Sequence, residues 1–405
     1  MAGAIILILF LFLLTQPILK NLKGKFLFLS IDLMNKLFAY HYVFWGIYYW
    51  YQTFNPSDSK GYYEHASSGY SSWFEAFGTD TMFIDFVGYP FASTLGFSYA
   101  SMMALFAWFG FLGFVFFYIF FKENIKTNPK FYGIDMVTIF LFLPNMHFWT
   151  VAFSKGSIIF LGIGLFAYAM RLPQKRIALL LLGSFIVFQI RPHVFMFLAA
   201  GAVVGYFTGK DKVPVYQKML VYISCIGGLI LFYDQVLAIA NINLEEEGLV
   251  EGFEEFASGR ASSLSRSASG IDINSYPLPM KLLTFWFRPL FFDAPGALGI
   301  FVSVENLLYL LLTYKLIDKN FIRFIKNSSS LVKMSFTIFL TSSLALAFVM
   351  ANLGIAMRQK SMVMYFLFFV IISFVDYKRQ VKIKRYQLLK QQQEANLSVT
   401  SHAYS

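Results

Sequence analysis

The sequence predicts an all-α fold, a polytopic membrane helical bundle of about 11 transmembrane helices, with re-entrant or interfacial helices on its outer face. Three observations predict this fold. The 405-residue chain is 58% hydrophobic and 20% aromatic. Charged residues make up 14% of it, whereas an ordinary soluble domain carries about 25%. Long uncharged stretches recur, such as 1–19, 98–121 and 361–375, and about 20 apolar residues cross a bilayer.

Apolar stretches separated by charged residues place the individual spans. The first stretch, MAGAIILILFLFLLTQPIL, has no basic n-region and no small-residue cleavage site, so we expect a retained helix and not a signal peptide. The predicted spans are about 1–19, 36–52, 98–121, 133–150, 156–170, 177–190, 194–208, 218–240, 296–314, 334–355 and 361–376.

The basic residues between these spans fall on two sides. One side holds 24 of the 33 lysines and arginines with 7 acids, a net +17, and the other holds 9 with 15 acids, a net −6. The positive-inside rule places the larger set in the cytoplasm, with the N-terminus outside and the C-terminus cytoplasmic. A basic cytoplasmic rim on an anionic leaflet explains the net charge of +11, so no nucleic-acid partner is predicted.

The chain is expected to form one transmembrane domain, 1–377, and a basic cytoplasmic tail, 378–405, that is partly disordered. Two long external loops interrupt the domain, at about 53–97 and 241–295. The first contains TMFIDFVGYPFASTLGF, which is too polar to span and too apolar for water, and this favours an interfacial or re-entrant helix. Long loops of this kind carry function or are disordered.

The stretch FQIRPHVFMF places Arg191, Pro192 and His193 inside an apolar region. We expect a helical hairpin over 177–208 with Arg191 at its outer tip. One long helix kinked at Pro192 is the alternative, but it would put the neighbouring basic clusters on opposite faces of the membrane.

Four cations share one sequence context, in which an apolar helix meets the outer surface. They are Lys155 in VAFSKGS, Arg191 in QIRPH, Arg288 in FWFRPL and Arg358 in AMRQK. Charges at membrane depth usually face a cavity or a partner, and arginine binds phosphate oxygens in a bidentate fork. The four therefore indicate a site for a lipid-linked diphosphate. The alternative for each is a side chain that only reaches the interface as an anchor.

Three residues of the outer face are candidates for accepting a proton: Asp58, Glu64 and His193. The structural alternatives are solvated loop acids and a hydrogen-bonded interfacial histidine. Arg260 and Arg266, in the Ser/Gly-rich part of the second loop, are candidate substrate contacts.

Three stretches carry a resemblance to a known group of proteins, and together they cover about a third of the chain. They are NPSDSKGYYEHA with the GTDTMFIDFVGYPFASTLGFS that follows it, LPNMHFWTVAFSKGSIIFLGIGLFAY, and NLGIAMRQKSMVMYFLFFVIISF. The pattern resembles the polytopic O-antigen and exopolysaccharide polymerases of bacteria, and the wider class of membrane glycosyltransferases that use lipid-linked sugars.

This resemblance implies that a polyprenyl diphosphate-linked glycan is the substrate and that the chain resides among the lipids of the bacterial inner membrane. It implies that Arg191, Arg288 and Arg358, with Lys155 as a fourth, hold the diphosphate. Asp58 matches the acid that such enzymes place in the first external loop. No second acid stands beside Asp58, so neither a metal nor another cofactor is predicted.

The implied reaction is sugar transfer, in which a glycan hydroxyl attacks an anomeric carbon and lipid diphosphate leaves. Two other function classes stay open. A transporter or flippase for an anionic lipid or glycan would place charges near the bilayer midplane and show repeat symmetry. A non-catalytic subunit of an envelope assembly would use the outer loops to bind protein partners, whose identity the sequence does not indicate.

Overall fold

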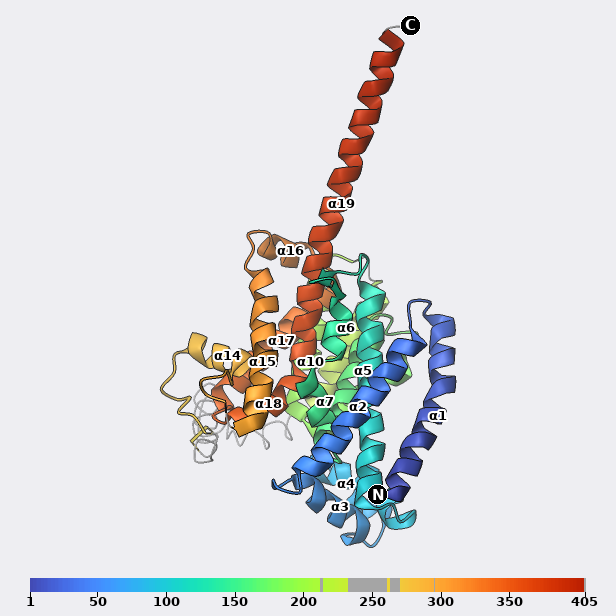
Figure 1. Cartoon of the computed structure of the whole chain (residues 1–405), viewed down its shortest axis with the longest axis vertical. Coiled ribbons are helices and arrows are strands. Elements are labelled where there is room, and N and C mark those ends of the chain that lie inside the picture. The colour runs from blue at the N-terminus through green and yellow to red at the C-terminus, as the bar shows by residue number, and fades with distance from the viewer. Residues whose placement is uncertain (212–213, 232–260, 263–269, 295, 404–405) are drawn as a thin grey trace.

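The computed structural model describes residues 1–211, 214–231, 261–262, 270–294 and 296–403 (Figure 1). Within these residues the chain is mostly helical, with a single two-stranded hairpin, so the predicted all-α class is confirmed. The elements are α1 (Ala2–Lys25), α2 (Ile31–Tyr51), α3 (Asp58–Ser68), η1 (Trp73–Ala76), α4 (Thr81–Tyr89), η2 (Pro90–Thr94), α5 (Tyr99–Asn124), β1 (Lys130–Phe131), β2 (Ile134–Asp135), α6 (Met136–Leu141), α7 (Pro144–Thr150), α8 (Lys155–Ala169), α9 (Ile177–Ile190), α10 (Pro192–Thr208), α11 (Val215–Leu231), α14 (Leu278–Phe287), α15 (Gly296–Thr313), η3 (Tyr314–Leu316), α16 (Phe321–Asn327), α17 (Ser330–Val349), α18 (Leu353–Gln359), η4 (Lys360–Met362) and α19 (Met364–Ala403).

The predicted membrane spans are supported in part. In the described residues, 4 helices are long and apolar enough to cross a membrane, or 5 if the bent pair α18 and α19 counts as one span. They are α1, α5, α15 with η3, and α17. The apolar helices α8, α9 and α10 are shorter, and the predicted span 133–150 is divided into α6 and α7, with Pro144 as the first residue of α7. Eleven spans are therefore not confirmed.

The two ends of the bundle differ in what they carry (Figure 1). The N-terminus of α1 lies at the end where α3 and α4 gather, and these helices belong to the predicted external loop 53–97. α19 leaves the bundle at the opposite end and continues as one helix through the basic tail to Ala403.

α5 forms the centre of the bundle, and 78% of its most apolar 18-residue stretch is buried. Two of its glycines let neighbouring helices approach closely. A Cβ atom on Gly110 would lie 2.2 Å from the backbone oxygen of Thr150, and one on Gly113 would lie 2.7 Å from the ring of Phe160. Small residues at such crossings are typical of membrane helix packing, and here they seat α7 and α8 against α5.

A buried ion pair fixes the far end of α8. Arg176, just before α9, donates two hydrogen bonds of 2.8 and 2.6 Å to the carboxylate of Glu123 at the end of α5. Its guanidinium also lies 3.8 Å from the ring centroid of Tyr168 on α8. Because the pair is bidentate and largely buried, it holds α8 firmly against α5.

We expect Gly110→Ala to destabilise the bundle by about 1–3 kcal/mol, because the added methyl group would collide with the backbone of α7. Gly46→Ala is the matched control, since a Cβ atom on this glycine of α2 meets nothing within 4 Å. The thermal unfolding midpoint of the full chain in detergent checks this. Equal midpoints for the two variants would show that the α5–α7 contact is looser than described.

Candidate functional site

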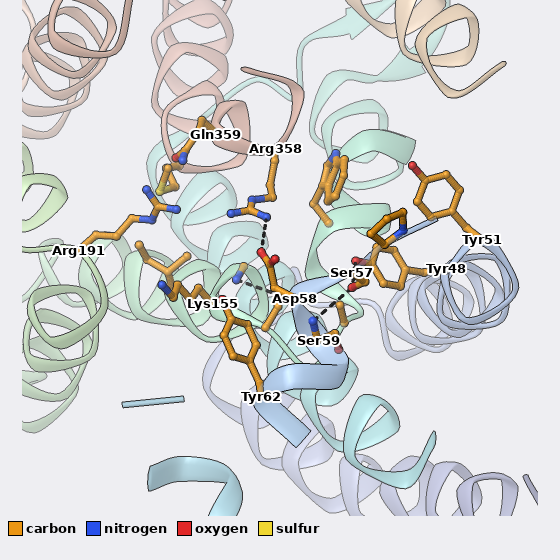
Figure 2. Close-up of a pocket in the computed structure, with 17 residues that line it drawn as sticks. Tyr48, Tyr51, Ser57, Asp58, Ser59, Tyr62, Lys155, Arg191, Arg358 and Gln359 are labelled. Atoms are coloured by element: carbon orange, nitrogen blue, oxygen red, sulfur yellow. Dashed lines mark hydrogen bonds and ion pairs between the residues drawn. The ribbon is translucent and has the colours of Figure 1, made fainter. Parts of the chain in front are cut away.

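Four residues predicted from the sequence line one pocket at the end of the bundle that carries α3 (Figure 2). They are Asp58, Lys155, Arg191 and Arg358. The cavity has a volume of about 250 Å³, and residues of α2, α3, α7, α8, η4 and α18 surround it. The site is thus assembled from parts of the chain that are far apart in sequence.

Asp58 is the first residue of α3, directly after the capping residue Ser57. The Ser57 hydroxyl accepts a hydrogen bond from the Ser59 amide and lies 3.1 Å from the Tyr48 hydroxyl, which ties the start of α3 to α2. The Asp58 carboxylate points to Arg358, with 3.5 Å between Oδ2 and Nη1 (Figure 2). Both side chains keep access to solvent, at 67% and 40% exposure, so a ligand can reach the pair.

Arg358 occupies the last turn of α18. Asn352 caps the start of this helix, its Oδ1 accepting a hydrogen bond of 3.0 Å from the Ile355 amide. The Asn145 side chain of α7 donates a 2.9 Å bond to the Met357 carbonyl, the residue before Arg358. α7 therefore holds the turn that presents the guanidinium.

Buried polar groups fix α15 to the same region. The Glu305 carboxylate accepts a 2.7 Å hydrogen bond from the backbone N–H of Asn145 and a second bond from the Tyr309 hydroxyl. The Lys360 ammonium donates to Asn306 at 2.8 Å and to the Arg288 carbonyl at 2.7 Å. Polar groups at membrane depth need such internal partners, so this network sets how α7, α15 and η4 meet.

Lys155 opens α8, and its ammonium lies 2.5 Å from the carboxylate of Asp80. It also lies 6.0 Å from the ring centroid of Tyr62, one turn along α3 from Asp58. Burial first, and then the charge of Asp58, raises the pKa of the Tyr62 hydroxyl. A lysine at a helix N-terminus is opposed by the helix dipole, so Asp80 offsets the cost of keeping it there.

The start of α8 adds to the positive potential of the pocket. Ser154, Lys155 and Gly156 all line the cavity. The amide groups of a first helical turn have no partner within the helix, and they attract anions. The Gly156 amide donates a 3.3 Å hydrogen bond to the hydroxyl of the capping residue Ser154, and a Cβ atom on Gly156 would lie 2.4 Å from the Trp149 carbonyl oxygen.

Arg191 stands between α9 and α10, and Pro192 is the first residue of α10. A residue before proline is disfavoured in the helical conformation, and Arg191 has φ −150° and ψ 83°. The expected break is thus confirmed, and the side chain reaches into the pocket from this corner (Figure 2). The Asp80 amide donates a 2.6 Å hydrogen bond to the Gln189 carbonyl nearby, which links Lys155 and Arg191 through one loop.

Other predicted site residues lie elsewhere in the described chain. Arg288 bonds to Asp293 and also contacts Tyr276 and Thr284, and it does not line the pocket. Neither do His193, whose ring contacts Phe197, and Glu64, which is exposed on α3.

Arg260 and Arg266, the candidate contacts of the second loop, lie outside the described residues.

Two further cavities adjoin the pocket. A cavity of about 300 Å³ shares Tyr51, Trp149 and Arg358 with it. A larger one of about 610 Å³ shares Tyr51 and Leu298 with the second, and its walls are mostly apolar residues of α2, α7 and α15. The arrangement can hold an anion at the cationic end and an apolar chain along the groove.

The sequence interpretation missed two structural features of this region. Asp80, the partner of Lys155, could not be told from other loop acids by its sequence context. The spacing of Asp58, Tyr62 and His65, at i, i+4 and i+7, could have indicated one shared face of a helix, because such positions align along a helix.

No protein-family model, curated protein or solved structure matches the chain. Within the described ranges, no group of three or more histidine, cysteine, aspartate or glutamate side chains is placed to hold a metal ion.

We expect inorganic diphosphate to bind the detergent-solubilised chain, and Arg191→Gln or Arg358→Gln to weaken binding about 10- to 100-fold. Each variant loses charge-assisted hydrogen bonds worth about 1.5–3 kcal/mol. Isothermal titration calorimetry measures the affinity. Lys60→Gln is the control, because Lys60 is an exposed cation of α3 that does not line the pocket. Equal weakening in Lys60→Gln would mean that the anion binds the general basic surface.

Proposed function

We propose that the chain transfers or polymerises oligosaccharides carried on polyprenyl diphosphate, at the outer face of the bacterial inner membrane, in surface polysaccharide synthesis. The observation that carries this proposal is the meeting of Lys155, Arg191 and Arg358 in one pocket that adjoins an apolar groove. A lipid-linked diphosphate needs both environments side by side.

The proposal includes a topology of eleven spans with the N-terminus outside and the C-terminus in the cytoplasm. Its support is the position of the pocket at the same end of the bundle as the N-terminus and the helices of loop 53–97. The basic tail extends from the opposite end. A chain arranged in this way presents its cationic pocket to the extracytoplasmic side.

In this proposal the apolar groove holds the beginning of the prenyl chain. Its lining includes Ile47, Trp50, Phe54 and Phe301, which are 42%, 66%, 71% and 52% exposed. Large apolar side chains exposed at membrane depth are in contact with lipid, so a prenyl chain can enter between α2 and α15 from the bilayer. The diphosphate then lies at headgroup level, near Arg358.

The cations would assist the reaction by stabilising the leaving group. When the anomeric carbon–oxygen bond breaks, the diphosphate takes the electron pair, and Arg191, Arg358 and Lys155 neutralise the charge that develops. Groups held in place before the reaction are effective because they need no reorganisation. Removing one such donor costs about 2.7–4 kcal/mol of transition-state stabilisation in well-studied sites.

The alternative is a transporter or flippase of an anionic lipid or glycan. One observation favours it, which is the burial of Glu305 and Lys360 inside the bundle, since ionisable residues within a membrane often mark transport routes. Both are bonded to neighbouring protein groups, so they also serve the packing described above.

We expect Arg191→Ala and Arg358→Ala to abolish long-chain surface glycan at unchanged protein level, in source cells that lack the native gene and carry the variant. Lys60→Ala is expected to restore native chain lengths. Gel separation of the extracted glycan checks this.

The alternatives give other results in the same cells. Accumulation of lipid-linked units on the cytoplasmic side would support a flippase. Native glycan in both arginine variants would contradict the proposal.

A further inference from the structure

A second group of polar side chains lies next to the pocket, on the same face of α3. His65 follows Asp58 by seven residues, close to two helical turns, so both side chains project from nearly the same side. Tyr62, which lines the pocket, stands between them. The axial distance from Asp58 to His65 is roughly 10 Å, which is about the length of a sugar unit and its linkage.

His65 faces a carboxylate from the next helix. Its Nδ1 atom lies 3.6 Å from Oδ2 of Asp85 on α4, and the same oxygen accepts a 2.9 Å hydrogen bond from the Tyr70 hydroxyl. The Asp85 side chain is fully buried, whereas the His65 side chain is 61% exposed. The Asp85 carboxylate therefore faces Nδ1 of His65, and Nε2 of the exposed ring is left available to a ligand.

Burying the carboxylate of Asp85 costs the folded state free energy. Its Oδ1 atom is buried with no hydrogen-bond partner among the described residues. Burial raises the pKa of Asp85, and the hydrogen bond from Tyr70 and the nearby charges of His65 and Lys155 offset part of that rise. A carboxyl group with a raised pKa in the folded state loses its contribution to stability as the pH rises and the group ionises. The ionised carboxylate of Asp85 therefore does not stabilise the folded state. A buried ionisable residue of this kind is a candidate for a role in function.

We propose that His65 is the group that takes the proton from the acceptor hydroxyl of the incoming saccharide, and that Asp85 is a positioning residue that orients the imidazole. The acceptor sugar then lies along α3, over the ring of Tyr62. This inference depends on the proposed function, because it assigns the acceptor half of the same reaction.

The proposed step exchanges one bond at the anomeric carbon for another. The acceptor oxygen forms a bond to the anomeric carbon of the lipid-linked sugar, and the bond from that carbon to the diphosphate oxygen breaks. The acceptor proton passes to Nε2 of His65, and the diphosphate takes the electron pair. The resulting imidazolium is stabilised by Asp85 and later releases its proton to water.

The geometry favours His65 over the acids predicted from the sequence. Asp58 lies within 3.5 Å of Arg358, so it serves as the counter-ion of the arginine at the place where the diphosphate would bind. Glu64 is one residue before His65 and therefore projects about 100° away from it around α3.

Chemical rescue tests the assignment. His65→Ala in the full chain, reconstituted in vesicles with lipid-linked oligosaccharide extracted from the source cells, is expected to slow chain extension about 100- to 10,000-fold. Imidazole added to the medium is expected to restore part of the rate, because the side chain it replaces is largely exposed. A structural role for His65 would give no such rescue.

Asp85→Asn tests the positioning role. We expect a lower turnover number with a nearly unchanged KM, no rescue by imidazole, and a thermal unfolding midpoint equal to or above that of the native chain. A large fall in the midpoint would assign Asp85 to folding and overturn its role in the reaction.

Two comparisons separate the inference from the function on which it rests. If Arg358→Ala loses extension while His65→Ala keeps it, the proton acceptor is wrong and the function stands. Loss in Glu64→Gln or Asp58→Asn with native rates in His65→Ala would also overturn the assignment. If Arg358→Ala and His65→Ala both keep native extension, the proposed function itself fails.

Discussion

The pocket depends on hydrogen bonds made where water cannot compete for them. Asn145, Glu305 and Lys360 join α7, α15 and η4 through side-chain and backbone partners inside the bundle. Removing one partner would leave another buried group unsatisfied, at a cost of about 1–3 kcal/mol. Trp149 lies on α7, and Arg358 lies on α18, where the carbonyl of the preceding residue, Met357, accepts a hydrogen bond from Asn145. The interior of the bundle therefore sets the geometry of the pocket.

The cations of the pocket have a common structural origin. Lys155 begins α8, Arg191 separates α9 from α10, and Arg358 lies in the last turn of α18. A residue at a helix end can direct its side chain past the apolar body of the helix, toward the polar surface. Several helix ends that meet in one pocket therefore concentrate positive charge at one end of the bundle.

This origin explains what the sequence could and could not predict. Cations at the boundary between apolar and polar sequence indicated helix ends, and Asp58, Lys155, Arg191 and Arg358 indeed converge. Arg288 has the same context, but Asp293 five residues later binds it, and that partner was visible only in three dimensions. Hydropathy identified the apolar helices but does not fix how many of them span a membrane, because helices of 14 to 17 residues such as α9 and α10 are apolar but short for a bilayer.

The ion pair between Asp58 and Arg358 affects how the pocket binds an anion. An empty pocket is already partly neutralised, since the carboxylate occupies the arginine that an incoming anion would bind. Entry of the anion is then an exchange of one negative partner for another, and so is its departure. In the proposed function, such an exchange weakens the binding of the diphosphate released in one round and favours its departure before the next.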